Sequence, residues 1–166
     1  MEFVYKCIIG LGNPGNQNTS RHNVARLYLD SLGSSWNRIN NGEVSVIEGI
    51  ILYKPSGSIN TCGQQIKQAV KQFRITNEEF IVIHDNIDIP LGQIVVNKHN
   101  AKGHSGIKSL TQAFQNQEFN KLHIGIGRPT GGEIKDYVLS SFSRNELEYL
   151  HNNVYPQCSR QLRLCR

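Results

Sequence analysis

Three polar segments of the chain carry residue types that could do chemistry, and the first contains a histidine at the start of an expected helix. Residues 19–23 read Thr-Ser-Arg-His-Asn and precede an apolar helical stripe. The positive end of a helix dipole disfavours an imidazolium ion, so we expect His22 to stay neutral and able to accept a proton near pH 7. A lone histidine is nevertheless more often a cap or a surface residue. The segment therefore indicates a general base without establishing one.

The second segment, residues 84–88, places a carboxylate directly after an apolar run that ends at Ile83. Ligands of open α/β sheets bind at the carboxyl ends of the strands, which is where Asp85 would stand. A carboxylate there can hold a catalytic imidazole in one tautomer and stabilise its cation as it forms. Asp85 and Asp88 could equally do no more than build the turn that follows. We interpret Asp85 as the candidate partner of a catalytic histidine.

The third segment, residues 98–108, is a glycine-bearing loop that opens a helix and contains two histidines and three lysines, Lys98, Lys102 and Lys108. Backbone N–H groups at a helix start suit a phosphate or a peptide carbonyl, and lysines add positive charge. A solvated flexible loop is the ordinary alternative. The composition favours contact with phosphate.

A glycine run at residues 10–15 has the spacing G-x-G-x-x-G after an expected strand, which is typical of a dinucleotide-binding turn. Such a site also needs an acidic residue about 20 positions further on, at the end of a second strand. Asp30 instead falls inside a helical stripe, and Asn13-Pro14 interrupts the place where the helix should begin. A nicotinamide-dependent oxidoreductase is therefore a weak alternative, and a purely structural glycine turn a somewhat stronger one.

The elements that must position these segments alternate along the chain. Apolar runs predict strands near residues 3–9, 44–53, 80–84, 93–96 and 121–126. Helical stripes lie at 24–32, 66–73 and 107–114, and a capping-box pair at Ser143 and Glu146 announces another helix. This alternation predicts an α/β fold: one three-layer domain over residues 1–166, with a twisted, mixed but mostly parallel sheet and helices on both faces. Residues 152–166 show weak periodicity and are expected to be irregular.

The composition restricts the class of protein. The formal charge of +5 would attract a polyanion, although a solvated basic surface has the same charge. The four cysteines form no C-x-x-C pair and have no closely spaced histidine, so neither a zinc site nor a redox dithiol is indicated. The apolar runs are far shorter than the roughly 20 residues that cross a bilayer, and no signal-peptide pattern precedes them. We expect a soluble intracellular protein.

Taken together and in this order, the segments resemble the bacterial-type peptidyl-tRNA hydrolase family over about residues 6–139. The matching pieces are Gly-Leu-Gly-Asn-Pro-Gly at 10–15, Thr-Ser-Arg-His-Asn at 19–23, Asn60 with Gly63, His-Asp-Asn-Ile-Asp-Ile-Pro at 84–90, Gly-His-Ser-Gly-Ile-Lys at 103–108 and Gly-Ile-Gly-Arg-Pro at 125–129. No single piece would suffice, and the combination carries the resemblance.

The resemblance implies hydrolysis, without metal or organic cofactor, of the ester that joins a peptide to the terminal ribose of tRNA. It implies that His22 activates water and that Asp85 orients His22. It further implies a set of substrate-binding residues, Asn13, Asn23, Asn60, His104 and Ser105, and a set of tRNA-binding residues, Lys98, Lys102 and Lys108. The expected partner is peptidyl-tRNA, bound by a monomer in the cytoplasm or, after import, in mitochondria, and not at a membrane.

The chain also departs from the family pattern. Ser105 stands where the family usually has asparagine, and Asn97 and His123 replace basic residues that grip the 5′ phosphate of the tRNA. The loop before His22 is one residue short, and the helix beyond Leu150 looks abbreviated. These departures keep a second class open, a catalytically weak family member that acts as an RNA-binding or ribosome-associated protein.

Overall fold

The computed structural model describes residues 5–15, 18–33 and 35–165. Within them the strands are β1 (Cys7–Gly10), β2 (Asn37–Ile39), β3 (Gly42–Ile47), β4 (Ile50–Pro55), β5 (Phe80–Asn86), β6 (Ile94–Asn97) and β7 (Asn120–Gly125). The helices are α1 (Val24–Leu32), α2 (Gly63–Gln72), α3 (Ser105–Ala113), α4 (Ile134–Leu139), α5 (Arg144–Tyr149) and α6 (Tyr155–Gln161). Two further turns are helical: the 3-10 turn η1 (Arg21–Asn23) and the π-helical turn η2 (Leu150–Val154). In this part of the chain no helix has the length and apolar character needed to cross a membrane.

The strands form one seven-stranded sheet in the order β2-β3-β4-β1-β5-β7-β6. Its centre is parallel, because β1 pairs in parallel with β4 and β5, and β5 pairs in parallel with β7. Strands β2, β3 and β6 pair antiparallel at the two edges. Strands β1 and β5 are almost wholly buried, as expected of parallel strands covered on both faces. The predicted α/β class with a mixed sheet is confirmed, and the parallel part is confined to the centre.

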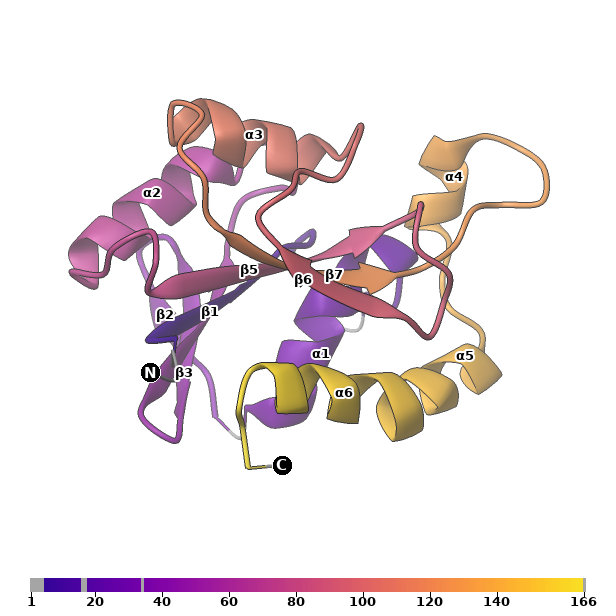
Figure 1. Ribbon diagram of the computed structural model, residues 1–166, viewed down its shortest axis with the longest axis horizontal. Coiled ribbons are helices and arrows are strands. Elements are labelled where there is room, and N and C mark those ends of the chain that lie inside the picture. Colours follow the sequence, from indigo (N-terminus) through magenta and orange to yellow (C-terminus); the bar gives the residue numbers. More distant parts are fainter. Residues whose placement is uncertain (1–4, 16–17, 34, 166) are drawn as a thin grey trace.

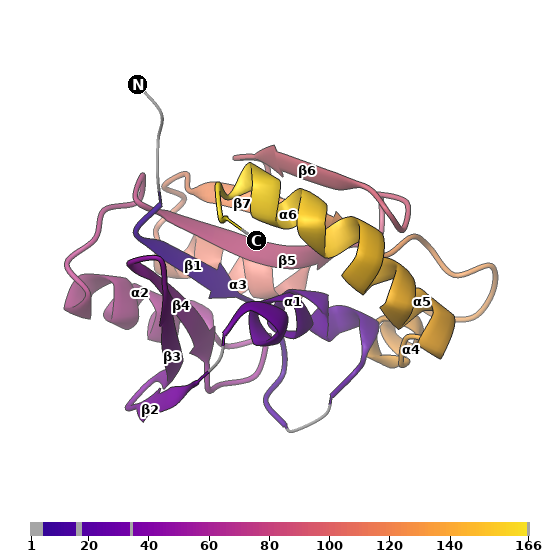
Figure 2. The same cartoon turned by 90° about the horizontal axis from the view of Figure 1, so that it is seen from below.

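Helices cover both faces of the sheet (Figure 1). Helices α2 and α3 lie on one face, and α1 and α6 lie on the other, as the view from below also shows (Figure 2). Neighbouring strand residues point to opposite faces, so Ile9 and Val82 enter the core beneath α2 and α3. Ile8 and Ile81 enter the core beneath α1 and α6. The two cores hold the carboxyl ends of β1 and β5 in fixed positions side by side.

The predicted elements are found with a few differences. The apolar run at 44–53 is a hairpin and not one strand, since β3 and β4 meet at Glu48 and Gly49. These two residues have φ of 51° and 80°, the left-handed values that a tight two-residue hairpin loop requires. Strand β2 and helix α4 were not predicted, and residues 3–4 of the first expected strand lie outside the described residues.

The expectation of an irregular tail over residues 152–166 is wrong for the described part, 152–165. Helix α5 continues through η2 into α6. Along this continuous stretch, buried residues recur every fourth position, at Leu150, Val154, Cys158 and Leu162, and they join the core on the α1 side. Pro156 is the second residue of α6, which begins directly after the π-helical turn η2, and the helix continues past it. The tail therefore forms part of one covering layer.

Candidate active site

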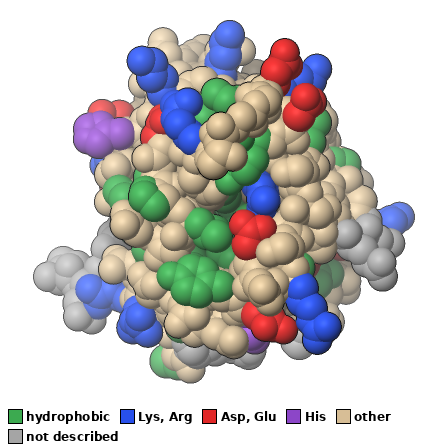
Figure 3. Space-filling model, turned by 90° about the vertical axis from the view of Figure 1, so that its right-hand side faces the viewer, with side chains coloured by type: hydrophobic (Ala, Val, Ile, Leu, Met, Phe, Trp, Pro, Cys, Tyr) green, Lys and Arg blue, Asp and Glu red, His purple; other side chains and the backbone are tan. Residues whose placement is uncertain are grey.

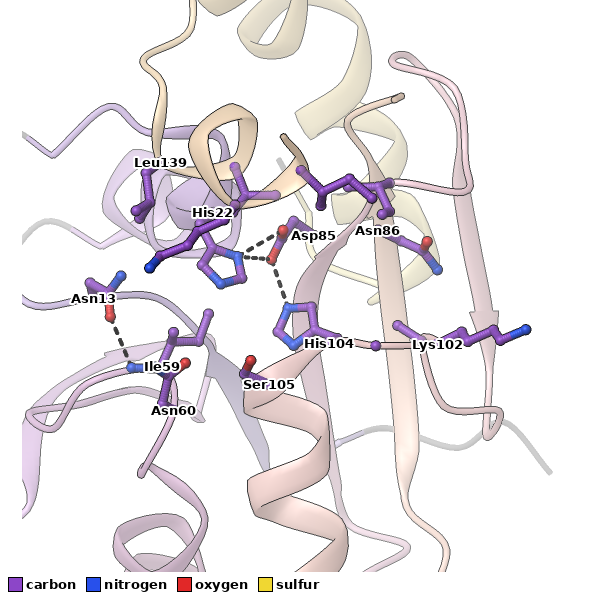
Figure 4. Close-up of a pocket in the computed structure, with 16 residues that line it drawn as sticks. Asn13, His22, Ile59, Asn60, Asp85, Asn86, Lys102, His104, Ser105 and Leu139 are labelled. Atoms are coloured by element: carbon purple, nitrogen blue, oxygen red, sulfur yellow. Dashed lines mark hydrogen bonds and ion pairs between the residues drawn. The ribbon is translucent and has the colours of Figure 1, made fainter. Parts of the chain in front are cut away.

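The carboxyl end of β5 and the turn η1 bring His22 and Asp85 together (Figure 4). The Nδ1 atom of His22 lies 2.8 and 2.9 Å from the two carboxylate oxygens of Asp85. A carboxylate only accepts, so His22 donates from Nδ1, and in the neutral ring Nε2 is the unprotonated nitrogen. Figure 4 shows this second nitrogen turned toward the space between Asn13, Asn60 and Ser105. The ring is thus oriented as a base that faces a pocket.

His104 is the second histidine on the same carboxylate. Its Nε2 lies 2.8 Å from Oδ1 of Asp85, and its ring centre is 5.1 Å from that of His22. Its Nδ1 accepts the backbone N–H of Ile107 at 3.2 Å, which makes His104 the N-cap of α3. Because Nδ1 accepts, the proton must sit on Nε2 and point to Asp85. The helix start thereby fixes the tautomer of this ring.

Asp85 is an ionised carboxylate at the centre of these bonds. Burial alone would raise its pKa, but the charge and hydrogen bond of His104, together with those of His22, hold the pKa of this carboxyl well below its usual range. The side chain is nearly inaccessible to solvent. Its negative charge therefore acts mainly on the rings of His22 and His104.

The same three side chains have the composition of a metal site, since one donor atom from each lies within 4.8 Å of the others. Their hydrogen bonds argue for a different use. A metal on Nε2 of His104 would require the opposite tautomer, and its Nδ1–H would then face the N–H of Ile107. The cluster is better suited to two N–H donors that share one carboxylate.

Asn13 presents its side-chain Nδ2 to the pocket, because its Oδ1 and its main-chain groups are already hydrogen bonded. Its Oδ1 accepts the N–H of Ile59 at 2.9 Å, which leaves Nδ2 as a donor. Asn23 brackets the main chain of Asn13, accepting its N–H at 2.8 Å and donating to its carbonyl at 2.9 Å. Asn23 is buried and does not line the pocket. It therefore positions Asn13 and does not reach the place where a substrate would bind.

Arg21 fastens the segment before His22 to the C-terminal part of the chain. Its Nη1 lies 3.1 Å from Oε1 of Glu146, and its guanidinium stacks over the rings of Tyr137 and Phe142 at 4.8 and 5.1 Å. Glu146 also closes the predicted capping box at the start of α5, which is confirmed. Because Arg21 adjoins His22, these contacts limit how far the His22 ring can move.

A pocket of about 430 Å³ opens over these side chains. Of the residues singled out in the sequence, it is lined by Asn13, His22, Asn60, Asp85, Lys102, His104 and Ser105. Three of the others stand outside it. Besides the buried Asn23, Lys98 pairs with Glu78 at 3.0 Å, and Lys108 is exposed along α3. The structure thus assembles the polar site and leaves two of the three lysines at a distance from it.

Helix α4 supplies an apolar wall that was not predicted, formed by Ile134, Val138 and Leu139. Ile134 and Leu139 are 43% and 51% exposed. Figure 3 shows hydrophobic side chains gathered across the middle of the face that carries α4 and α5, with most charged side chains toward its margins. The pair Ile134 and Val138 has helical i, i+4 spacing, which is the sequence signal that could have revealed this wall.

Asn97 and His123, the two departures from the basic pattern, are hydrogen bonded to each other. Nε2 of His123 lies 2.9 Å from Oδ1 of Asn97, and Nδ1 lies 3.0 Å from Nδ2 of Asn86. An amide oxygen accepts and an amide nitrogen donates, so a neutral ring protonated at Nε2 satisfies both neighbours. Burial, reinforced by the charge of Lys121, lowers the pKa of His123 to about 4. No cationic side chain is offered at this pair.

Lys121 does not replace the missing charge. Its Nζ donates to the carbonyls of Lys98 and Phe119 at 2.9 and 3.3 Å, and burial lowers its pKa to about 8. The side chain is buried and lies over the ring of Phe119. Lys121 therefore ties the start of the basic loop to β7.

The neutral His123 makes stability dependent on pH. The unfolded chain binds a proton at this residue below about pH 6.5, whereas the folded chain does so only below about pH 4. We expect the free energy of unfolding to fall as the pH falls through this window, with an upper bound of about 3 kcal/mol from His123. Urea denaturation at several pH values would measure it. In His123→Gln, whose amide can still reach both neighbours, the fall should be smaller, and parallel curves for the two proteins would contradict the assignment.

Comparison with known proteins places this chain in a family. A family model described as peptidyl-tRNA hydrolase matches residues 7–166. The peptidyl-tRNA hydrolase of Bacillus subtilis (strain 168) is 38% identical over 159 residues, covering 89% of this chain and 85% of that protein. That of Listeria welshimeri is also 38% identical, over 152 residues, with 85% and 83% covered. The matches extend beyond the pocket to the whole fold.

Solved structures of peptidyl-tRNA hydrolases have a similar fold. A crystal structure of a peptidyl-tRNA hydrolase variant from Acinetobacter baumannii superposes with a TM-score of 0.78 at 25% identity, covering 98% of this chain and 96% of that one. A complex of peptidyl-tRNA hydrolase with N-propanol gives 0.77 at 25% identity, with 95% and 94% covered. The resemblance inferred from spaced motifs is confirmed, and the chain belongs to the peptidyl-tRNA hydrolase family.

Proposed function

We propose that the chain hydrolyses the ester bond of peptidyl-tRNA and that His22 activates the attacking water. One observation carries the mechanism: both oxygens of Asp85 hold Nδ1 of His22, so the unprotonated Nε2 faces a pocket lined by amide groups. Membership of the family supports the same reaction. An ester needs only an aligned water, a neutral base and donors to the developing oxyanion.

The proposed reaction begins with a water between Nε2 of His22 and the ester carbonyl carbon. As the water oxygen bonds to this carbon, Nε2 takes a proton and the carbonyl oxygen becomes an oxyanion. Asp85 stabilises the resulting imidazolium, and Nδ2 of Asn13 is a donor available to the oxyanion. When the tetrahedral species collapses, the carbon–oxygen bond to the ribose breaks and His22 returns the proton to the ribose oxygen. The products are a peptide with a free carboxyl group and tRNA.

The pocket has two kinds of wall, and we assign them to the two parts of the substrate. The amides of Asn13 and Asn60 suit the peptide main chain, and the apolar side of α4 suits peptide side chains. Lys102 stands at the rim, where it can meet a phosphate. Lys98 and Lys108 are proposed to contact RNA further out. Lys98 would first leave Glu78, at small cost because exposed ion pairs contribute about 0 to 1 kcal/mol.

We also propose that residues 1–166 act as one domain and as a monomer. Its place would be the cytoplasm, or mitochondria after import, where translation generates peptidyl-tRNA.

A direct assay tests the reaction. The purified protein is incubated with N-acetylaminoacyl-tRNA, with and without EDTA, and release of the acyl amino acid is followed. We expect release at equal rates in both conditions. Saturable RNA binding without release would instead favour the RNA-binding alternative, and loss of activity in EDTA would contradict the proposed metal-free chemistry.

Ser105 is the departure that lies inside the pocket, at the first residue of α3. Its hydroxyl is shorter than an asparagine amide and has one donor in place of two. We expect Ser105→Asn to raise kcat/KM by about fivefold, the gain from one additional hydrogen bond. Ser105→Ala, which removes the hydroxyl, should lower it. A lower or unchanged kcat/KM in Ser105→Asn would mean that the loop has adapted to serine.

A further inference from the structure

A second cavity, of about 570 Å³, lies between α1 and the strands β2, β3 and β4. We call it the α1 cavity; its charged lining consists of Arg26, Asp30, Arg38, Glu43 and Lys54. The loop after β1 borders both cavities, since Asn13 lines the active-site pocket while Pro14 and Gly15 line the α1 cavity. An occupant of the α1 cavity would therefore contact the loop that carries Asn13.

Two of the three cations in this cavity face carboxylates of their own. Nζ of Lys54 lies 2.5 Å from Oδ1 of Asp30 and also over the ring of Trp36 at 3.9 Å. Arg38 stands directly opposite Glu43 in the ladder between β2 and β3. Both carboxylates favour the charged form of Arg26, but among the described residues neither lies within ion-pair distance of it. Among the described residues neither Arg26 nor Arg38 has a carboxylate at ion-pair distance, and of these two Arg26 is the buried one.

Arg26 is a buried guanidinium with unused donors. It is only 7% exposed, and burial lowers its pKa, partly offset by Asp30 and Glu43. Within the described residues its single hydrogen bond runs from Nη1 to the carbonyl of Pro55 at 2.9 Å. A guanidinium carries five N–H donors and remains protonated in proteins. Its other nitrogens are not among the buried unpaired atoms, so they open to the cavity, where water or a ligand can accept from them.

The stem of Arg26 packs closely against the loop after β1. A Cβ atom at Gly12 would overlap Cδ of Arg26 and would lie 2.9 Å from Oδ1 of Asn23. Glycine is therefore required where the arginine stem passes, and the stem packs beside the Asn13–Asn23 bracket. This packing and the hydrogen bond to the Pro55 carbonyl restrain the guanidinium before any ligand arrives, which reduces the entropy lost on binding.

We propose that the α1 cavity is an oxyanion site that takes a phosphate group, bound through Arg26 with support from Arg38 and Lys54. The planar fork of a guanidinium matches two phosphate oxygens at once, and burial strengthens such charge-assisted bonds. The phosphate can belong to the backbone of an RNA or to a free phosphate compound. Only the RNA source depends on the proposed function.

Binding of inorganic phosphate and of a short RNA hairpin is measured by calorimetry on the full chain. The variants are Arg26→Gln, Arg38→Gln and, as a matched control, Lys67→Gln, which removes an exposed charge from α2. For the ligand that binds, we expect Arg26→Gln to weaken affinity by about 10- to 100-fold, the range for a charge-assisted hydrogen bond. Arg38→Gln should weaken it severalfold, and Lys67→Gln should leave it unchanged. Arg38 is exposed, so its variant decides the question if Arg26→Gln does not fold.

The two possible sources of the phosphate group, an RNA backbone and a free phosphate compound, predict different kinetic results. If the site takes RNA, Arg26→Gln raises KM for N-acetylaminoacyl-tRNA at unchanged kcat and reduces the salt slope of RNA binding by about one. If it takes a free phosphate compound, KM stays the same and only inorganic phosphate loses affinity. Equal affinities of wild type and both arginine variants for both ligands, or absence of saturable phosphate binding together with unaltered RNA binding, would overturn the proposal. Binding is measured without turnover, so this result stands apart from that of the ester assay.

Discussion

His22→Ala is expected to reduce kcat/KM for ester cleavage by about 10²- to 10⁴-fold, the usual contribution of a general base. The affinity for tRNA should remain roughly unchanged, because the ring contacts Asp85 and faces the pocket interior. Single-turnover release of the acyl amino acid, measured beside an RNA-binding titration, separates the two effects.

His151→Ala is the matched control for this variant. His151 is exposed on η2 and does not line the pocket, so its loss should leave kcat/KM as in the wild type. Full activity in His22→Ala would contradict the mechanism. A weakened RNA affinity with unchanged single-turnover release would instead make His22 a binding residue.

Asp85→Asn is expected to lower kcat by about 10²- to 10⁴-fold with little change in KM, by analogy with the loss of the orienting acid in hydrolase triads. The carboxylate accepts N–H groups from two rings, of His22 and His104. An amide offers one oxygen and two N–H donors, so at least one ring must turn or change its tautomer. The imidazolium formed during the reaction would also lose its counterion.

Asp88→Asn controls for a general effect of charge in this segment, since Asp88 is exposed, pairs with Arg128 and does not line the pocket. Its kcat should match the wild type. If Asp85→Asn were equally active, Asp85 would be only a structural residue at the end of β5.

The place of Asp85 in the site could be predicted because it depends on a general rule. Ligand-binding side chains gather at the carboxyl ends of parallel strands, and Asp85 comes directly after the apolar run that ends at Ile83. His22 is separated from the first strand by a polar loop, and its pairing with Asp85 was implied by the family resemblance. The tail beyond residue 152 was harder to predict, because Pro156 suggested a break. The spacing of Leu150, Val154, Cys158 and Leu162 is nevertheless helical, and a longer window would have detected it.

Other properties of the site depend on contacts between residues far apart in sequence. Nothing in the local sequence of Asn23 reveals that its amide serves the main chain of Asn13. Likewise, Lys98 meets Glu78, and the α4 wall reaches the pocket only through the packing of the chain after β7. The sequence was enough to nominate the polar residues of the site. It could not predict which of their groups are already hydrogen bonded and which remain free for a ligand.

The contact between Arg21 and Glu146 bears on the order in which the active site is completed during synthesis. All the polar pocket residues discussed above lie between Asn13 and Ser105, so they leave the ribosome early. The residues that hold Arg21, and with it the His22 segment, are Tyr137, Phe142 and Glu146, which are synthesised later. Chains grow at about 5–20 residues per second, so the His22 segment waits several seconds for these contacts after Ser105 has been added.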